Sequence, residues 1–195
     1  MKRFIWLPVL ALLAIFALGS PAHAILLELT PTPGTVPVGS PVSVALSISG
    51  LTGDLALGTF DLDVTFNPVI LSFSGATYGT GLDVLGLGDI QATTPGSGSV
   101  NLFELSLDSP TDLATLQPDS FLLATLSFDT LAPGISPLGL SINALGDAWG
   151  VGLVADWNGA IVTVTTPSVP EPGTLLLLAT GLAGMGGVAW RRRRG

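Results

Sequence analysis

The fold is indicated most directly by the stretch Gly58-Thr59-Phe60-Asp61-Leu62-Asp63-Val64-Thr65-Phe66. Successive side chains of a strand point to opposite faces, so the four apolar residues of this stretch share one face. Asp61 and Asp63 share the other. Residues 42–49 alternate in the same way between aliphatic and small residues. Both patterns predict strands with one buried and one exposed face, which is typical of antiparallel sheets.

Further short strands are predicted along the chain, at residues 25–30, 69–73, 100–107, 121–128, 138–142 and 161–165. Residues 74–99 are rich in Gly, Ser and Thr, and we expect long loops there with at most one short strand. Ser109 as N-cap, Pro110 at the first helical position and Asp112 in the first turn predict one short helix ending near Leu116. This pattern favours an all-β fold, a two-sheet antiparallel β-sandwich with one short helix.

The charged residues are distributed very unevenly. All six basic residues lie at the two ends of the chain, at Lys2, Arg3 and residues 191–194. From Ile25 to Val169 there are thirteen acidic residues and no Lys, Arg, His or Cys. A body of this charge is repelled by phosphate backbones, which excludes nucleic acid as a partner. No disulfide can form, so stability has to come from a hydrophobic core.

The same inventory restricts catalysis, because neither a Ser-His-Asp nor a Cys-His arrangement can be assembled in this body. Two carboxylates suffice for glycoside hydrolysis, and Asp61 and Asp63 share a strand face. An exposed strand face is not a cleft, however. We therefore predict no enzyme and no catalytic residue, with a carboxylate-only glycoside hydrolase as the remote alternative.

Two further groups of residues could bind ligands. Calcium prefers oxygen ligands, and acidic residues near glycines occur at Asp83, Asp89, Asp147 and Asp156. We expect, however, that these aspartates only keep the body soluble and that the protein has no cofactor; calcium bound at these loops is the alternative. Trp149 and Trp157, with Asp156 and Asn158, could form a platform for a sugar, or the two indoles could simply cap one end of the sandwich.

The amino end reads as a secretory signal peptide over residues 1–24. Met1-Lys2-Arg3 is a basic start, residues 4–18 are apolar, and Ala22-His23-Ala24 supplies the small residues of a cleavage site. The mature chain is therefore expected to begin at Ile25 and to be exported through the inner membrane.

The carboxyl end has three parts. A short linker, residues 166–169, leads to Val169-Pro170-Glu171-Pro172-Gly173, then to an apolar run at 174–190 and to Arg191, Arg192, Arg193 and Arg194. The run is just long enough for a transmembrane helix, and the arginines should hold its end in the cytoplasm. Two prolines around a glutamate keep residues 170–173 out of the helix. From hydropathy alone, a plain membrane anchor is the alternative.

This tail resembles the PEP-CTERM sorting signal of exported bacterial proteins, in which the same three parts occur in the same order. The resemblance covers residues 169–194. It implies recognition by an exosortase, transient anchoring in the membrane and processing near residues 170–173. The processed protein would then reach the cell surface or extracellular matrix, or be secreted.

Residues 25–165 resemble a second family. Residues 38–44, 58–73 and 126–128 are similar to stretches of the cohesin and carbohydrate-binding sandwiches. The resemblance implies a jelly roll and, as a partner, a dockerin-type protein or a polysaccharide. We therefore predict a non-enzymatic exported protein of the surface or matrix. The alternative is a binding module specific for a polysaccharide or a dockerin-type protein.

Overall fold

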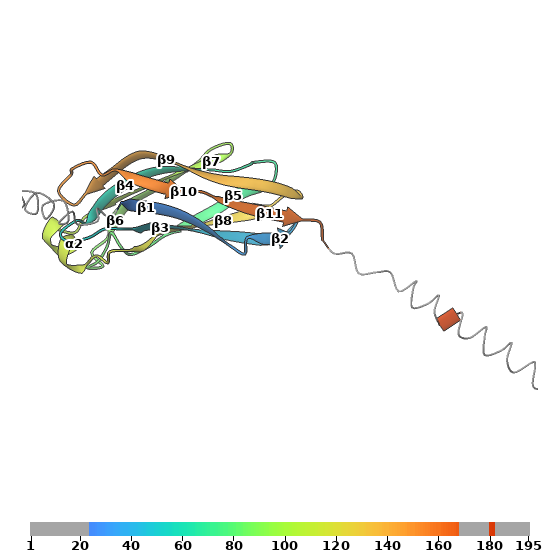
Figure 1. Cartoon of the computed structure of the whole chain (residues 1–195), viewed down its shortest axis with the longest axis horizontal. Helices are drawn as coiled ribbons and strands as arrows, with labels where there is room; N and C mark the ends of the chain where they lie inside the picture. Colours follow the sequence, from blue (N-terminus) through green and yellow to red (C-terminus); the bar gives the residue numbers. More distant parts are fainter. Residues whose placement is uncertain (1–23, 168–179, 182–195) are drawn as a thin grey trace, which may run out of the picture.

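The computed structural model describes residues 24–167 and 180–181. Two sheets pack face to face, and one helix, α2 (Pro110–Leu116), lies at one end of the sandwich (Figure 1). The first sheet contains, in spatial order, β10 (Ala155–Asn158), β1 (Ile25–Thr32), β3 (Pro41–Ser49), β8 (Phe121–Thr130) and β5 (Leu71–Tyr78). The second contains β2 (Thr35–Pro37), β11 (Ala160–Thr165), β9 (Gly134–Asp147), β4 (Leu57–Thr65), β7 (Ser99–Ser106) and β6 (Asp89–Pro95).

The core fills the space between the two sheets. In β4 the predicted alternation is observed, since Phe60, Leu62 and Val64 are fully buried while the two aspartates point outward. Phe128 of β8 makes edge-on contacts with Phe66 and Phe73 at centroid distances of 5.1 and 5.8 Å. The buried core cluster is made of residues between Ile25 and Val164. The predicted all-β, two-sheet sandwich with one short helix is confirmed.

The sequence underestimated the number of strands. Residues 74–99, expected to be mostly loop, contain the second half of β5 and the whole of β6. Neither strand shows clean alternation of buried and exposed residues. Both are edge strands, and β5 also has a register irregularity between Phe73 and Gly75. The short strands β2 and β10 were not predicted either. They pair in parallel with β11 and β1, which are distant in sequence.

Helix α2 begins as predicted. The Ser109 hydroxyl accepts a hydrogen bond from the Asp112 backbone N–H at 3.2 Å, and Pro110 occupies the first turn. At its other end the Gln117 side chain binds both backbone groups of Leu57, at 2.6 and 2.9 Å, and the Gly81 carbonyl at 2.8 Å. These bonds attach the helix to the start of β4 and to the loop that follows β5.

The two ends of the sandwich are different. Helix α2 lies at one end, and β11 finishes at the other, beside β2 (Figure 1). In the part of the chain that the structure describes, no helix is long and apolar enough to cross a membrane. The predicted signal peptide and sorting tail lie outside this part, apart from residues 24 and 180–181.

Candidate functional site: an outer sheet face

The outer face of the six-stranded sheet has a hydrogen-bonded group of four polar side chains near its centre, here called the polar quartet: Asp61, Asp63, Asn101 and Asn143. Asn101 Nδ2 donates to Asp61 Oδ1 at 2.6 Å and to Asp63 Oδ1 at 3.0 Å. Asn143 Nδ2 donates to Asp61 Oδ1 at 3.1 Å and to Asp63 Oδ2 at 2.9 Å. The amides of β7 and β9 therefore fix the positions of the two carboxylates of the strand between them, β4.

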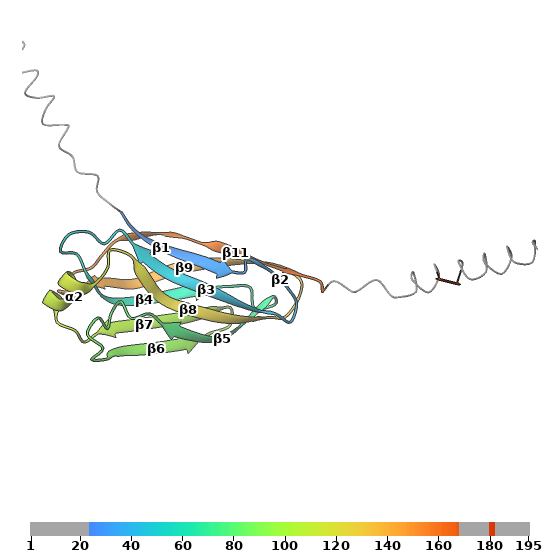
Figure 2. The same ribbon diagram turned by 90° about the horizontal axis from the view of Figure 1, so that it is seen from below.

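An apolar stripe lies next to the quartet, formed by Ile90, Phe103 and Leu105. Phe103 is opposite Asp61 in the β4–β7 register, and Leu105 is opposite Ile90 in the β6–β7 register. Ile90 is 49% and Leu105 36% exposed. Figure 2 shows β6 and β7 side by side along this edge of the sandwich. Exposed apolar side chains beside oriented polar groups are features of protein-binding surfaces.

Our sequence reasoning identified the two aspartates and their shared exposed face, but not their partners. Asn101 occupies an outward position in the alternating stretch 100–107, so its face was predictable. Asn143 lies at an irregularity in the β4–β9 register, between Ile142 and Ala144, which removed the local signal. That both amides reach the same two carboxylates depends on strand order, which one strand's sequence does not contain.

Glu104 is a buried acidic residue that the sequence patterns did not single out. It points inward from β7, is only 1% exposed, and accepts a 3.4 Å hydrogen bond from Gln91. Burial, and then a hydrogen bond and charge repulsion from Asp89, raise the pKa of Glu104 to about 9, so it is protonated at neutral pH. The alternation with buried Val100 and Leu102 was the signal for its inward position.

Tyr78 connects the edge strand of one sheet, β5, to the edge strand of the other, β6. Its hydroxyl group donates to the Ala92 carbonyl at 2.6 Å and contacts Thr93 Oγ1 at 3.0 Å. Burial raises the pKa of Tyr78, although its hydrogen bonds act in the opposite direction. This contact joins β5 of one sheet to β6 of the other.

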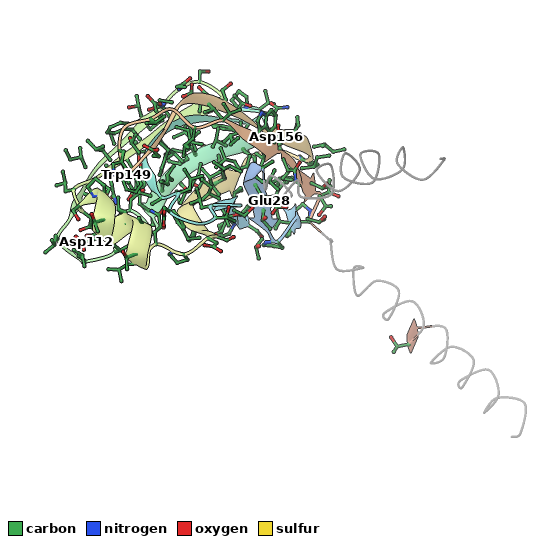
Figure 3. All side chains as sticks on the ribbon, turned by 60° about the vertical axis from the view of Figure 1, so that its left-hand side comes forward. Glu28, Asp112, Trp149 and Asp156 are labelled. Atoms are coloured by element: carbon green, nitrogen blue, oxygen red, sulfur yellow. The ribbon has the colours of Figure 1, made fainter. Side chains whose placement is uncertain are left out.

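The structure does not bring the predicted sugar platform onto one surface. Trp149, 55% exposed, lies in a turn at the α2 end, whereas Asp156 lies well away from it near Glu28 (Figure 3). Trp157 pairs with the buried Leu27, so its side chain points toward the core side of β10. Asp156 and Asn158 occupy the other side of that strand.

Several of the candidate calcium residues already accept hydrogen bonds from nearby groups. Asp83 Oδ1 accepts from the Gly88 N–H at 2.9 Å, and Asp147 Oδ1 accepts from the N–H groups of Trp149 and Val151. Across residues 24–167 and 180–181, no three acidic side chains are grouped so that they could hold a metal ion. The expectation of no cofactor, with calcium as the alternative, stays a prediction.

A groove of about 510 Å³ lies beside α2 at the end of the sandwich. Its lining is formed by Gly79, Thr80, Gly81, Asp83, Val84, Leu116, Pro118, Phe121 and Leu122. Among the predicted ligand residues, only Asp83 contributes to it. The polar quartet is therefore on an open sheet face and not in this groove.

Comparison with known proteins supports both the sorting motif and the fold of the sandwich. Residues 168–194 match the model of the PEP-CTERM protein-sorting motif. The sandwich resembles a non-cellulosomal cohesin from Archaeoglobus fulgidus, with a TM-score of 0.57 and 14% identity over 74% of this chain and 94% of that one. It also resembles the sixth cohesin of Acetivibrio cellulolyticus scaffoldin B, solved with a dockerin, with a TM-score of 0.61 and 18% identity over 73% and 99%.

A cohesin module from a Clostridium perfringens family 33 glycoside hydrolase is similar too, with a TM-score of 0.59 and 15% identity over 74% and 98%. No curated protein matches the chain significantly. The class is thus an exported β-sandwich protein, because the sorting motif implies exosortase-dependent export with transient membrane anchoring. More particularly, the chain combines a PEP-CTERM sorting motif with a cohesin-like fold.

Proposed function

We propose that this protein is a non-enzymatic binding module of the cell surface or extracellular matrix, delivered and processed through its sorting motif, whose outer sheet face binds a protein partner. The observation that carries the proposal is the polar quartet beside the apolar stripe on one continuous sheet face. Polar contacts with the quartet would orient a bound partner, and the stripe supplies apolar area that the partner can cover.

Two further observations support a protein partner. Several of the similar cohesins were solved in complex with dockerins, so a dockerin-type protein is the partner class we propose here. Asp61 and Asp63 are bound by amides on an open face and line no part of the groove, which favours recognition over hydrolysis.

The proposal is tested by site-specific photo-crosslinking of the full chain in its native host. A photoreactive residue replaces Leu105 in the stripe, and a matched control replaces Ile161, which is 59% exposed on β11 of the same sheet. We expect a discrete cross-linked protein, identified by mass spectrometry, at position 105 and none at 161. The same products at both positions, or none at 105, would contradict the proposal.

Polysaccharide binding is a second candidate, favoured by the exposure of Trp149, at 55%, and of Trp157, which is 45% exposed although it lies on the core-facing side of the edge strand β10. Indole faces of this kind stack on sugar rings. Separate Trp149→Ala and Trp157→Ala variants, assayed against a polysaccharide panel, test it. A full chain without affinity for any glycan, or two variants with unchanged affinity, would remove this candidate.

A further inference from the structure

The outer face has two carboxylates and no cation of its own. Between Ile25 and Val169 the sequence has no Lys, Arg or His, so no side chain of the mature body can neutralise Asp61 and Asp63. Among the residues that the structure describes, only the neutral amides of Asn101 and Asn143 donate to them. The two carboxylates therefore lie without a cationic neighbour on a surface that the proposed function requires a partner to cover.

The two carboxylates accept these hydrogen bonds differently: Asp61 accepts through one oxygen, and Asp63 accepts through both. Asp61 Oδ1 accepts from both amides, and each oxygen of Asp63 accepts from one. Within residues 24–167 and 180–181, no hydrogen bond reaches Asp61 Oδ2. This oxygen is therefore available to a donor from another molecule.

A second copy of this chain does not fit the face. Two copies meeting face to face through the quartet would bring four carboxylates together, and neither body could contribute a cationic side chain. Like charges placed opposite each other in an interface cost several kcal/mol, so the charge distribution disfavours self-association through this surface.

From this charge complementarity, and resting on the proposed function of the face, we infer that its occupant is a different protein, whose contact segment places an arginine or lysine over Asp61 and Asp63 and apolar side chains over the stripe. Arginine is the better match because its planar guanidinium can donate to two carboxylate oxygens at once. Uncharged partners would leave the pair desolvated without compensation.

The test uses the full chain in non-ionic detergent micelles, labelled for NMR and titrated with N-acetyl-arginine amide or with the uncharged N-acetyl-citrulline amide. We expect the arginine compound to shift the side-chain amide signals of Asn101 and Asn143 at least fivefold more than the citrulline compound. The Asp61→Asn/Asp63→Asn double variant should lose this preference at residues 101 and 143. Asp112→Asn, a change of a partly exposed acid on α2, should retain it.

Three results would overturn the inference: equal shifts with both compounds, arginine shifts spread evenly over all acidic positions, or an unchanged preference in the double variant. The cross-linking experiment at position 105 tests the proposed binding function independently of this inference. A cross-linked partner together with any of these three results would remove the cationic requirement and leave the proposed binding function in place.

Discussion

Burial controls the protonation of Glu104. Its carboxyl group lies in the sandwich interior, facing Gln91 and Asp89 of β6, with Asp83 and Tyr78 also near enough to influence charge. The folded-state pKa of about 9 exceeds the ordinary value of 4.5, so the folded state holds this proton more tightly than the unfolded state. The resulting stabilisation is complete below about pH 4.5 and is lost as pH rises through about 9.

Replacing Glu104 by Gln should therefore flatten the dependence of stability on pH. Gln keeps a polar group of similar size but has no proton to lose. Between pH 5 and pH 9 we expect the free energy of unfolding to fall by at least ~1 kcal/mol more in the wild type than in Glu104→Gln. Urea denaturation at both pH values measures this difference. Glu28→Gln, on the exposed side of β1, is the matched control and should behave as the wild type.

Single elements depend on a few polar contacts, and Gln117 shows this most clearly at the end of α2. Its amide satisfies the backbone N–H and carbonyl of the buried Leu57 and also the Gly81 carbonyl. We expect Gln117→Ala to lower the free energy of unfolding by about 2–3 kcal/mol, because buried backbone groups lose their partners. Chemical denaturation measures the loss, and a value within ~0.5 kcal/mol of wild type would contradict this role.

The first turn of the same helix provides a milder test. Ser109→Ala removes the side chain that accepts from the Asp112 N–H, and we expect a loss of about 1 kcal/mol in unfolding free energy. Thr111→Ala, at an exposed position in the first turn of the helix, is the control. It should be neutral or slightly stabilising, since Ala has the higher helix propensity. Equal losses in both variants would argue against a specific capping effect.

At the scale of the whole molecule, the sorting motif follows the sandwich in sequence and shares no strand with it. The motif begins at residue 168, and the last strand, β11, ends at Thr165. Cleavage near residues 170–173 would therefore leave every strand of both sheets intact. We predict that intact-mass spectrometry of envelope, matrix and medium fractions finds a main species that starts at Ile25 and ends near residues 170–173. A main species that retains residues 191–194 in the inner membrane would contradict processing.

Much of this protein could be predicted from local sequence patterns. The alternation in residues 58–66 and 42–49 predicted half-buried strands, and the residues around Ser109 predicted α2 and its cap. The three-part tail predicted the sorting motif. Each of these signals is contained in a few consecutive residues, because side-chain periodicity, capping and hydropathy are properties of short segments.

Tertiary structure decided the rest. Strand pairing joins residues far apart in sequence, so only the folded sheet brings Asn101 and Asn143 to the aspartates of β4, or Ile90 beside Leu105. It also separates Trp149 from Asp156, which are seven positions apart in the chain but on different parts of the molecule (Figure 3). The sequence by itself determined which residues face outward in the clearly alternating strands, and it contains the sorting motif that implies export. Which outward residues form a common surface depended on strand order, a non-local property that periodicity does not encode.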